Sequence, residues 1–397
     1  YLIKRLTMIS RREMLKLSSL FMLSGSLPLL QACNQRAEKS PDAPLRIGYL
    51  PITDATPLLV AHQQKLFEAE GVAVEAPKMF RSWAQLVEAF ISGQVNLVHL
   101  LSPMTVWARY GSQSPLKVLM WNHMAGSALT VAPSINSIKD LGGKTVAIPF
   151  WYSIHNVVLQ YLLRENGLEV TEQATPTAKQ VKLVVMAPSD MTPALAANSI
   201  AGFIVAEPFN ASAEQLGVGK VLRFTADVWR DHACCVSVMH SRDVEQRPEW
   251  TQKVVNALVK AQLWTQEHRV QTAALLSASG EHKYTPHLEP VLQKVLAPNS
   301  KDWQGYIDRG VIRHPDWQQS RIDFQPYPYA SYTEKLVQML QQTYIAGQHD
   351  FLAKLDPQTV AKELVDDRFV RQAILATQSQ AKFNIPDSFS RQETLVV

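Results

Sequence analysis

Cysteine is scarce in this sequence, and its scarcity excludes a protein that depends on a disulfide framework. The 397 residues include only Cys33, Cys234 and Cys235, too few for such a framework. Long hydrophobic runs are missing as well. The longest, residues 17–30, has about 14 residues, whereas a helix that spans a membrane needs about 20.

A strong charge excess is also missing from most of the chain. There are 39 basic and 35 acidic residues, a net charge of +4, and residues 1–32 alone hold five of the basic residues against one acidic residue. The remainder is balanced, so we expect no surface for nucleic acid. The glycine motifs of phosphate-binding loops and dinucleotide-binding turns do not occur in the sequence. We therefore expect no nucleotide cofactor, and we assign no metal ligands among the site residues.

Residues 1–32 have the pattern of an export signal. The charged stretch Ser10-Arg-Arg-Glu-Met-Leu-Lys16 precedes the short apolar run, which has no polar stripe of the kind an amphipathic helix would show. The stretch resembles a bacterial twin-arginine signal, although Sec leaders also contain paired arginines. Leu30-Gln-Ala-Cys33 resembles a lipobox, which implies lipid on Cys33 and a tether over residues 33–44. We expect a periplasmic protein anchored to a bacterial membrane.

Strand and helix patterns alternate along the mature chain. Alternating apolar residues predict the first strands, and apolar residues at helical spacing predict the helices between them. Thr56 and Ser82 are typical N-cap residues for the first two helices. The expected strands include 45–50, 72–78, 95–100, 116–121 and 128–132, and the expected helices include 56–71, 82–93, 154–166 and 249–267. The alternation is typical of an open α/β sheet.

The order of these elements predicts two lobes. We place lobe 1 at residues 45–140 and 240–397, and lobe 2 at residues 141–239. Two strands that cross between such lobes form a hinge. Ligands of open α/β sheets bind beyond the carboxyl ends of strands, at loops that precede helices. This rule selects the loops 53–56, 82–83, 150–155 and 207–209.

The loops contain sequences that resemble the solute-binding proteins of ABC importers for nitrate, bicarbonate, sulfonates and taurine. In chain order these sequences are Gly48–Pro57, Ser82-Trp83, Phe150–Asn156, Val184–Met191 and Gly202–Phe209. The likeness covers roughly residues 45–270. It implies an α/β, type II periplasmic-binding-protein fold, with two lobes of helix-flanked sheets, a two-strand hinge and a helical C-terminal segment.

The resemblance also implies a set of anion-binding positions. In the nitrate-type relatives a tryptophan, a glutamine, a loop glycine and a lysine hold the anion. These positions correspond here to Trp83, Ser127, Ser153 and Cys235. The positive side chain of the pocket is therefore replaced by a cysteine, and loss of a buried charge partner costs roughly 3–5 kcal/mol. The architecture is expected to transfer to this chain, whereas the nitrate or bicarbonate substrate is not.

Trp83 and three further candidates from the selected loops each have a structural alternative. Asp54 either accepts a hydrogen bond from the ligand or caps the helix after Thr56. Trp83 either stacks on the ligand or packs in the core of its lobe. His155 either donates to the ligand or caps its own loop. Glu207 either binds a ligand with N–H donors or hydrogen-bonds to backbone that crosses nearby.

The adjacent cysteines Cys234 and Cys235 allow three interpretations. They can close a strained vicinal disulfide. They can bind a soft metal together with His232, because thiolate and imidazole suit copper or zinc. The third interpretation is that they are two small residues of a hinge strand.

The resemblance implies a non-catalytic monomer that captures a small polar solute and presents it to an ABC permease and its ATPase. One alternative is an enzyme like the thiamine-pyrimidine synthases, or a binder of pyrimidine precursors. Another is a lipoprotein that senses a solute for a partner kinase. The export signal argues against the enzyme, whose relatives are cytosolic.

Overall fold

Two β-sheets organise the part of the chain that the structure describes, residues 43–396 without 318–319. In this computed structural model, the residues from Pro44 onward form one compact unit. The export signal, the lipid position Cys33 and nearly all of the tether lie outside the described residues. Within the described part, no helix is long and apolar enough to cross a membrane.

The first sheet has five strands in the order β2-β1-β3-β12-β4. Its strands β1, β2 and β3 are parallel, and β12 lies antiparallel between β3 and β4. The strands are β1 Ile47–Tyr49, β2 Lys78–Met79, β3 Leu97–Leu101, β4 Leu116–Trp121 and β12 Cys235–His240. The helices of this part are α2 Thr56–Gln63, α3 Leu66–Ala69, α4 Trp83–Ile91, α5 Ser102–Val106, α9 Ser241–Gln246 and α10 Pro248–Glu267.

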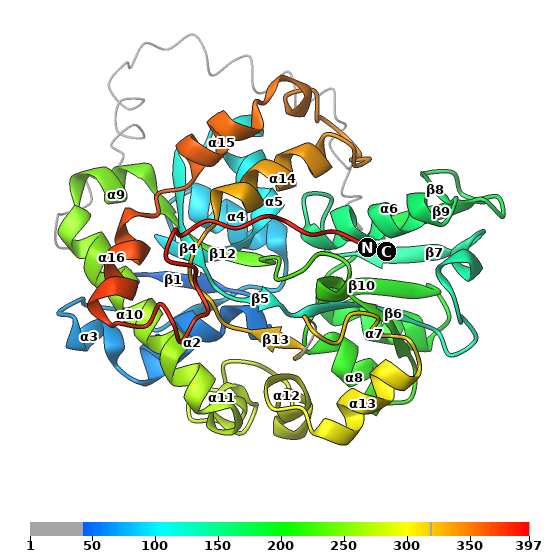
Figure 1. Ribbon diagram of the computed structural model, residues 1–397, viewed down its shortest axis with the longest axis horizontal. Helices are drawn as coiled ribbons and strands as arrows, with labels where there is room; N and C mark the ends of the chain where they lie inside the picture. The colour runs from blue at the N-terminus through cyan, green and yellow to red at the C-terminus, as the bar shows by residue number, and fades with distance from the viewer. Residues whose placement is uncertain (1–42, 318–319, 397) are drawn as a thin grey trace, which may run out of the picture. The chain divides into compact units, whose positions relative to one another are not determined.

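The second sheet has six strands in the order β11-β6-β10-β7-β9-β8 and lies to the right of the first in Figure 1. Its β7, β8, β9 and β10 are parallel, and β6 runs antiparallel between β10 and β11. The strands are β6 Ser127–Val131, β7 Thr145–Ile148, β8 Glu169–Thr171, β9 Gln180–Val185, β10 Gly202–Ala206 and β11 Lys220–Phe224. The helices here are α6 Ile154–Glu165, α7 Pro188–Ala196 and α8 Phe209–Gln215. This two-sheet α/β arrangement is the expected one.

The chain crosses between the sheets earlier than the expected boundaries at 140 and 240. Strand β6 already belongs to the second sheet, because all five of its residues pair with β10. The outward crossing therefore lies between Trp121 and Ser127, and the return crossing lies between Phe224 and Cys235. The two crossings touch, since Ala125 N–H donates to the carbonyl of His232 over 3.0 Å.

Local signals located most helices well, with one clear exception. Ser82 caps α4, because its Oγ accepts a hydrogen bond from Gln85 N over 3.3 Å. The helix expected over 56–71 is broken at Lys65, whose φ of 53° is left-handed and cannot continue a right-handed helix. The expected N-cap role of Thr56 is wrong, because Thr56 is the first helical residue and its hydroxyl donates to Thr53 O.

The C-terminal segment contacts both sheets rather than only the first. Its helices are α11 Arg269–Leu276, α12 Glu289–Leu296, α13 Ser300–Asp308, α14 Ala330–Leu340, α15 Pro357–Leu364 and α16 Arg368–Ala376. Helix α10 packs on α2 and α16, whereas Tyr306 of α13 packs with Phe224 of the second sheet. Tyr344 N–H donates to Gln160 of α6 over 2.8 Å. The range 240–397 is therefore not confined to lobe 1.

Candidate functional site

Four buried side chains from distant parts of the sequence meet where the chain crosses between the sheets. Asp54 lies in a short 3₁₀ turn, Thr53–Ala55, that follows β1. His123 lies on the outward crossing, and Cys234 and Cys235 lie at the end of the return crossing, where β12 begins. One ligating atom of each of the four lies within 4.8 Å of those of the other three.

Asp54 and His123 form a buried pair. Asp54 Oδ2 lies 3.0 Å from His123 Nε2, and neither side chain is exposed. Burial raises the pKa of Asp54 to about 6, although His123 opposes the shift. Burial by itself lowers the pKa of His123, but the Asp54 carboxylate more than compensates and raises it to about 10. The carboxylate of Asp54 therefore favours protonation of His123. The side chain of Asp54 does not cap α2.

Cys234 lies between this pair and His155 of the second lobe. Its Sγ is 3.8 Å from His155 Nε2, which lies 2.9 Å from Ser127 Oγ. Burial alone raises the pKa of the Cys234 thiol, but contacts with Cys235 and His155 hold it well below the usual value. Burial and the neighbouring Cys234 raise the pKa of Cys235. Cys234 is therefore the more acidic of the two thiols.

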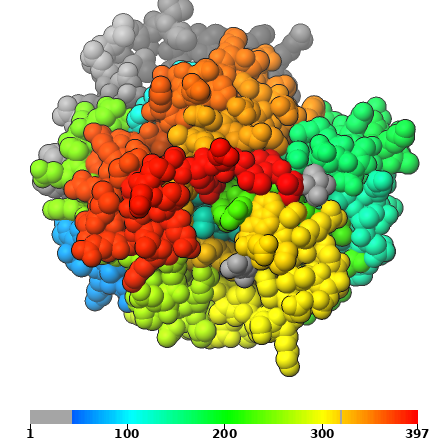
Figure 2. All heavy atoms as spheres, in the orientation of Figure 1, coloured from blue at the N-terminus to red at the C-terminus, as the bar shows by residue number. Residues whose placement is uncertain are grey.

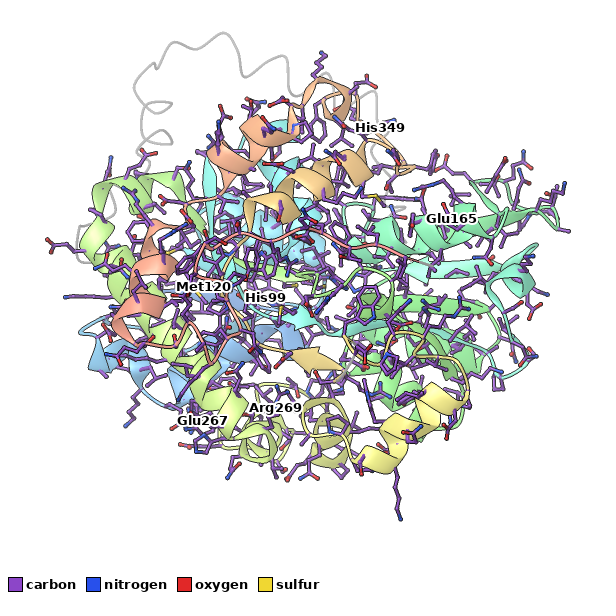
Figure 3. All side chains as sticks on the ribbon, in the orientation of Figure 1. His99, Met120, Glu165, Glu267, Arg269 and His349 are labelled. Carbon is purple, nitrogen blue, oxygen red and sulfur yellow. The ribbon has the colours of Figure 1, made fainter. Side chains whose placement is uncertain are left out.

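Trp83 and His99 lie on the first-lobe side of this cluster. Their rings meet edge to face, with centroids 5.5 Å apart. His99 is held by a hydrogen bond from Leu50 N–H to its Nε2 over 2.9 Å, and burial lowers its pKa to about 3. Figure 3 shows His99 in the interior, well away from the peripheral Glu267 and His349. Trp83 is 2% exposed and packs within the core, while its indole Nε1 has no hydrogen-bond partner among the described residues.

Several polar atoms around the cluster have no hydrogen-bond partner among the described residues although they are buried. They are Trp83 Nε1, Asp54 Oδ1, His99 Nδ1, His155 Nδ1 and His232 Nδ1. Buried polar atoms in proteins are nearly always paired, and an unpaired one costs about 1–3 kcal/mol. These atoms gather around one cluster, which makes the cluster the candidate site among the described residues.

Ser153 and Glu207 make contacts within the protein. Ser153 Oγ accepts a hydrogen bond from Asn156 N over 3.0 Å and so caps α6. Glu207 Oε1 pairs with Arg321, and Glu207 Oε2 accepts from Ala211 N over 3.1 Å. Both carboxylate oxygens therefore have protein donors, and the carbonyl of Glu207 additionally accepts from Thr53 N over 3.1 Å.

Sequence reasoning missed His123, His99 and the place of Cys234 beside His155. His123 follows the predicted strand 116–121. No second histidine lies at helical spacing from it, so the sequence shows no pair of ligands that includes His123. His232, the expected partner of the cysteines, instead directs Nε2 to Thr225 Oγ1 at 2.8 Å. The position of His123 shortly after a predicted strand is the one feature that could have marked it as a site residue. That feature does not distinguish His123 from His232 as the partner of the cysteines.

A surface cavity of about 450 Å³ adjoins the outward crossing. Its wall includes Met124 and Ala125, which directly follow His123, together with charged groups such as Arg230, Asp231 and Arg391. Figure 2 shows this hollow between the red C-terminal residues and the yellow residues of the α13 region. The solvent-exposed wall of this cavity therefore includes residues that are adjacent in sequence to His123 of the buried cluster.

Comparison with known proteins agrees with this architecture. The nitrate/nitrite binding protein NrtA of Nostoc sp. is 26% identical over 262 residues, which are 60% of this chain and 58% of that protein. The nitrate import ATP-binding protein NrtC of Synechocystis sp. is 24% identical over 235 residues, 55% of this chain and 34% of that protein. The chain thus spans little more than half the length of the first relative and about a third of the second.

Among solved structures, the periplasmic nitrate-binding protein NrtA of Synechocystis superposes with a TM-score of 0.71. It is 18% identical in sequence, and the match covers 88% of this chain and 93% of that chain. The two-lobed α/β fold and the resemblance to this group of binding proteins are both confirmed. The model of the NMT1-like family matches residues 38–277, well over half of the sequence. The chain therefore belongs to the NMT1-like family.

Proposed function

We propose that this protein is the extracytoplasmic solute-binding component of an ABC importer. It captures a small polar nitrogen or sulfur compound at the junction of its two lobes and delivers it, chemically unchanged, to a permease and ATPase. The proposal is supported by membership of the family and by relatives that are named for nitrate binding and nitrate import.

The observation that carries the proposal is the group of buried polar atoms that lack partners among the described residues. Trp83 Nε1 is a donor, and Asp54 Oδ1 is an acceptor. These two atoms come from lobe 1, whereas His155 comes from α6 of lobe 2. A solute that satisfies all three contacts both lobes and stabilises the closed arrangement by its differential affinity.

The site chemistry distinguishes the proposed solute from those of the nitrate-type relatives. Cys235 stands at their lysine position, so this chain offers no ammonium group there. Asp54 provides a carboxylate, Trp83 provides an indole N–H group, and His155 provides a ring nitrogen. We propose Asp54, Trp83, Ser127 and His155 as the solute contacts, and assign Ser153 and Glu207 to positioning α6 and α8. Cys235 is not among the proposed solute contacts.

Export and anchoring are part of the proposal and rest on the sequence alone. The twin-arginine and lipobox motifs support export in a folded state, followed by lipidation of Cys33. Residues 33–44 then act as a tether that keeps the binding unit close to its permease. We propose that the anchored protein acts as a monomer.

The test is a thermal-shift and calorimetric screen of the purified mature protein with nitrate, cyanate, taurine, alkanesulfonates and pyrimidine precursors. One of these solutes should raise the melting temperature without being converted. Trp83→Phe retains most of the buried ring but removes the indole donor, so it should weaken binding about 10-fold, or ~1.4 kcal/mol. Trp264→Phe is the matched control. Trp264 lies near the end of α10, where its ring stacks on His268. Equal affinity of Trp83→Phe and the wild type, or formation of product, would contradict the proposal.

A further inference from the structure

The side chains of Asp54, His123, Cys234 and Cys235 offer one carboxylate oxygen, one imidazole nitrogen and two sulfur atoms to a single point. All four residues are buried, and the four atoms lie within 4.8 Å of one another. We propose that these residues form a binding site for one Zn²⁺ ion, with Asp54 and His123 as partners of the cysteines in place of the His232 considered from the sequence. This inference does not depend on the identity of the solute.

The spacing of the four atoms is close to that of a tetrahedral site. Zinc lies about 2.0 Å from oxygen or nitrogen ligands and about 2.3 Å from sulfur, so its tetrahedral ligands are roughly 3.3–3.8 Å apart. Asp54 Oδ2 and His123 Nε2 are 3.0 Å apart, and no pair in the set exceeds 4.8 Å. Side-chain movements of about 1 Å or less, within ordinary rotamer adjustment, bring all four atoms to bonding distance.

The donor set favours zinc over other common cations. Magnesium and calcium prefer shells of oxygen alone, which two sulfur atoms exclude. Copper(I) prefers thiolate and thioether ligands, whereas the carboxylate of Asp54 suits a divalent ion. Two thiolates and one carboxylate carry three negative charges, so with a neutral imidazole they neutralise a buried divalent cation and leave one negative charge in excess. Zinc also has no redox chemistry that would require a further partner.

Neighbouring groups hold the ligands in suitable orientations. His123 Nδ1 lies 3.4 Å from the carbonyl of Met124, a contact that directs Nε2 toward the cluster. Asn122 Nδ2 donates to the carbonyl of Asp54 over 3.1 Å and fixes the turn that carries its carboxylate. His155 Nε2 lies 3.8 Å from Cys234 Sγ and is a second-layer contact to one sulfur. Metal ligands in proteins commonly have such outer partners.

The position of the site gives the ion a structural consequence. Asp54 follows a strand of the first sheet, His123 lies on the outward crossing, and Cys234 and Cys235 end the return crossing. An ion held by all four joins the first loop to both connections between the lobes. Zinc binding is therefore expected to raise the free energy of unfolding even without solute, because the ion binds the folded chain only.

The test uses the mature protein, purified with a thiol reductant and freed of metal by a chelator. Co²⁺ is the spectroscopic probe, since thiolate ligands give it intense charge-transfer absorption. We expect one equivalent of Co²⁺ to produce this absorption and one equivalent of Zn²⁺ to abolish it. Zn²⁺ should also protect both thiols from a thiol-specific reagent and raise the melting temperature.

Variants decide which residues are ligands. The double variant Cys234→Ser/Cys235→Ser should lose the charge-transfer absorption. Asp54→Asn and His123→Gln should each weaken Zn²⁺ binding by more than the about 10–100-fold that loss of an outer partner costs. His232→Gln is the matched control, because this neighbouring histidine bonds Thr225 and should leave the metal affinity unchanged. Circular dichroism of each metal-free variant checks that it is folded. If the double cysteine variant does not fold, the Zn²⁺ affinity of Asp54→Asn still tests whether this residue is a ligand.

Three results would overturn the inference. The first is the absence of thiolate-to-Co²⁺ absorption in the reduced wild-type protein. The second is unchanged absorption in the double cysteine variant. The third is a vicinal disulfide in protein isolated from the exported fraction without reductant, seen as a mass two hydrogens lower. Solute binding measured in the presence of the chelator is independent of all three, so failure of the metal site is distinguishable from failure of the proposed function.

Discussion

Replacement of Glu207 by glutamine tests whether this residue supports the structure or contacts the solute. Glu207 is fully buried, and its two oxygens accept from Arg321 and from Ala211 N. Glutamine has one acceptor oxygen, so its NH₂ group must face one of these two donors. Arg321, itself 1% exposed, retains Glu214 as its second carboxylate partner.

The expected loss follows from these contacts. Removing one partner of a buried ion pair costs about 3–5 kcal/mol when the remaining charge is uncompensated. Because Glu214 still compensates Arg321, we expect Glu207→Gln to lower the free energy of unfolding by about 2–3 kcal/mol. The compact unit has about 350 residues. At an unfolding entropy of about 2.1 cal/mol/K per residue, the melting temperature should fall by ~3–4 °C.

Urea unfolding and calorimetry measure this loss, and titration with the solute found in the screen measures affinity. Glu267→Gln is the control, because the ion pair of Glu267 with Lys382 is more than half exposed on both sides and should contribute under about 1 kcal/mol. A Glu207→Gln protein as stable as the wild type but with weaker solute binding would refute our reasoning. It would show that Glu207 faces the solute.

Two other predictions concern acid stability and membrane attachment. Burial lowers the pKa of His287 to about 4, from 6.5, while its Nε2 lies 3.1 Å from the carbonyl of Pro51. Between these pH values the unfolded chain takes up a proton that the folded protein refuses, so stability falls as the pH drops from about 6.5 to about 4. In the His287→Gln variant, the free energy of unfolding should depend less steeply on pH over this range, by up to about 1.4 kcal/mol per pH unit. Urea unfolding at a series of pH values measures this dependence. Parallel curves for the variant and the wild type would contradict the prediction. Cys33→Ser should release the protein from membranes into the soluble fraction, and unchanged sedimentation with membranes would refute the lipobox interpretation.

Local sequence signals were sufficient for the order of elements. Ser82 and the apolar residues behind it located α4, and the pattern of 154–166 located α6, because capping and helical periodicity act over a few neighbouring residues. The same signals failed at Lys65, where a single left-handed residue divides the expected helix. They also failed for the crossings, because the apolar pattern of 127–131 fits either sheet and only the pairing with β10 assigns it to the second.

The fold class, the family resemblance and the export motifs can be predicted from the residues alone, since each depends on short stretches in chain order. The candidate site cannot, because it forms only when the chain is folded. Asp54, His123 and Cys234 are far apart along the chain, and no periodicity connects them. They meet because β1 ends where the two connections between the sheets pass each other. Burial at that junction excludes water from their charged groups and so shifts their pKa values. This effect depends on neighbouring side chains from several segments, which cannot be identified from any one segment of the sequence.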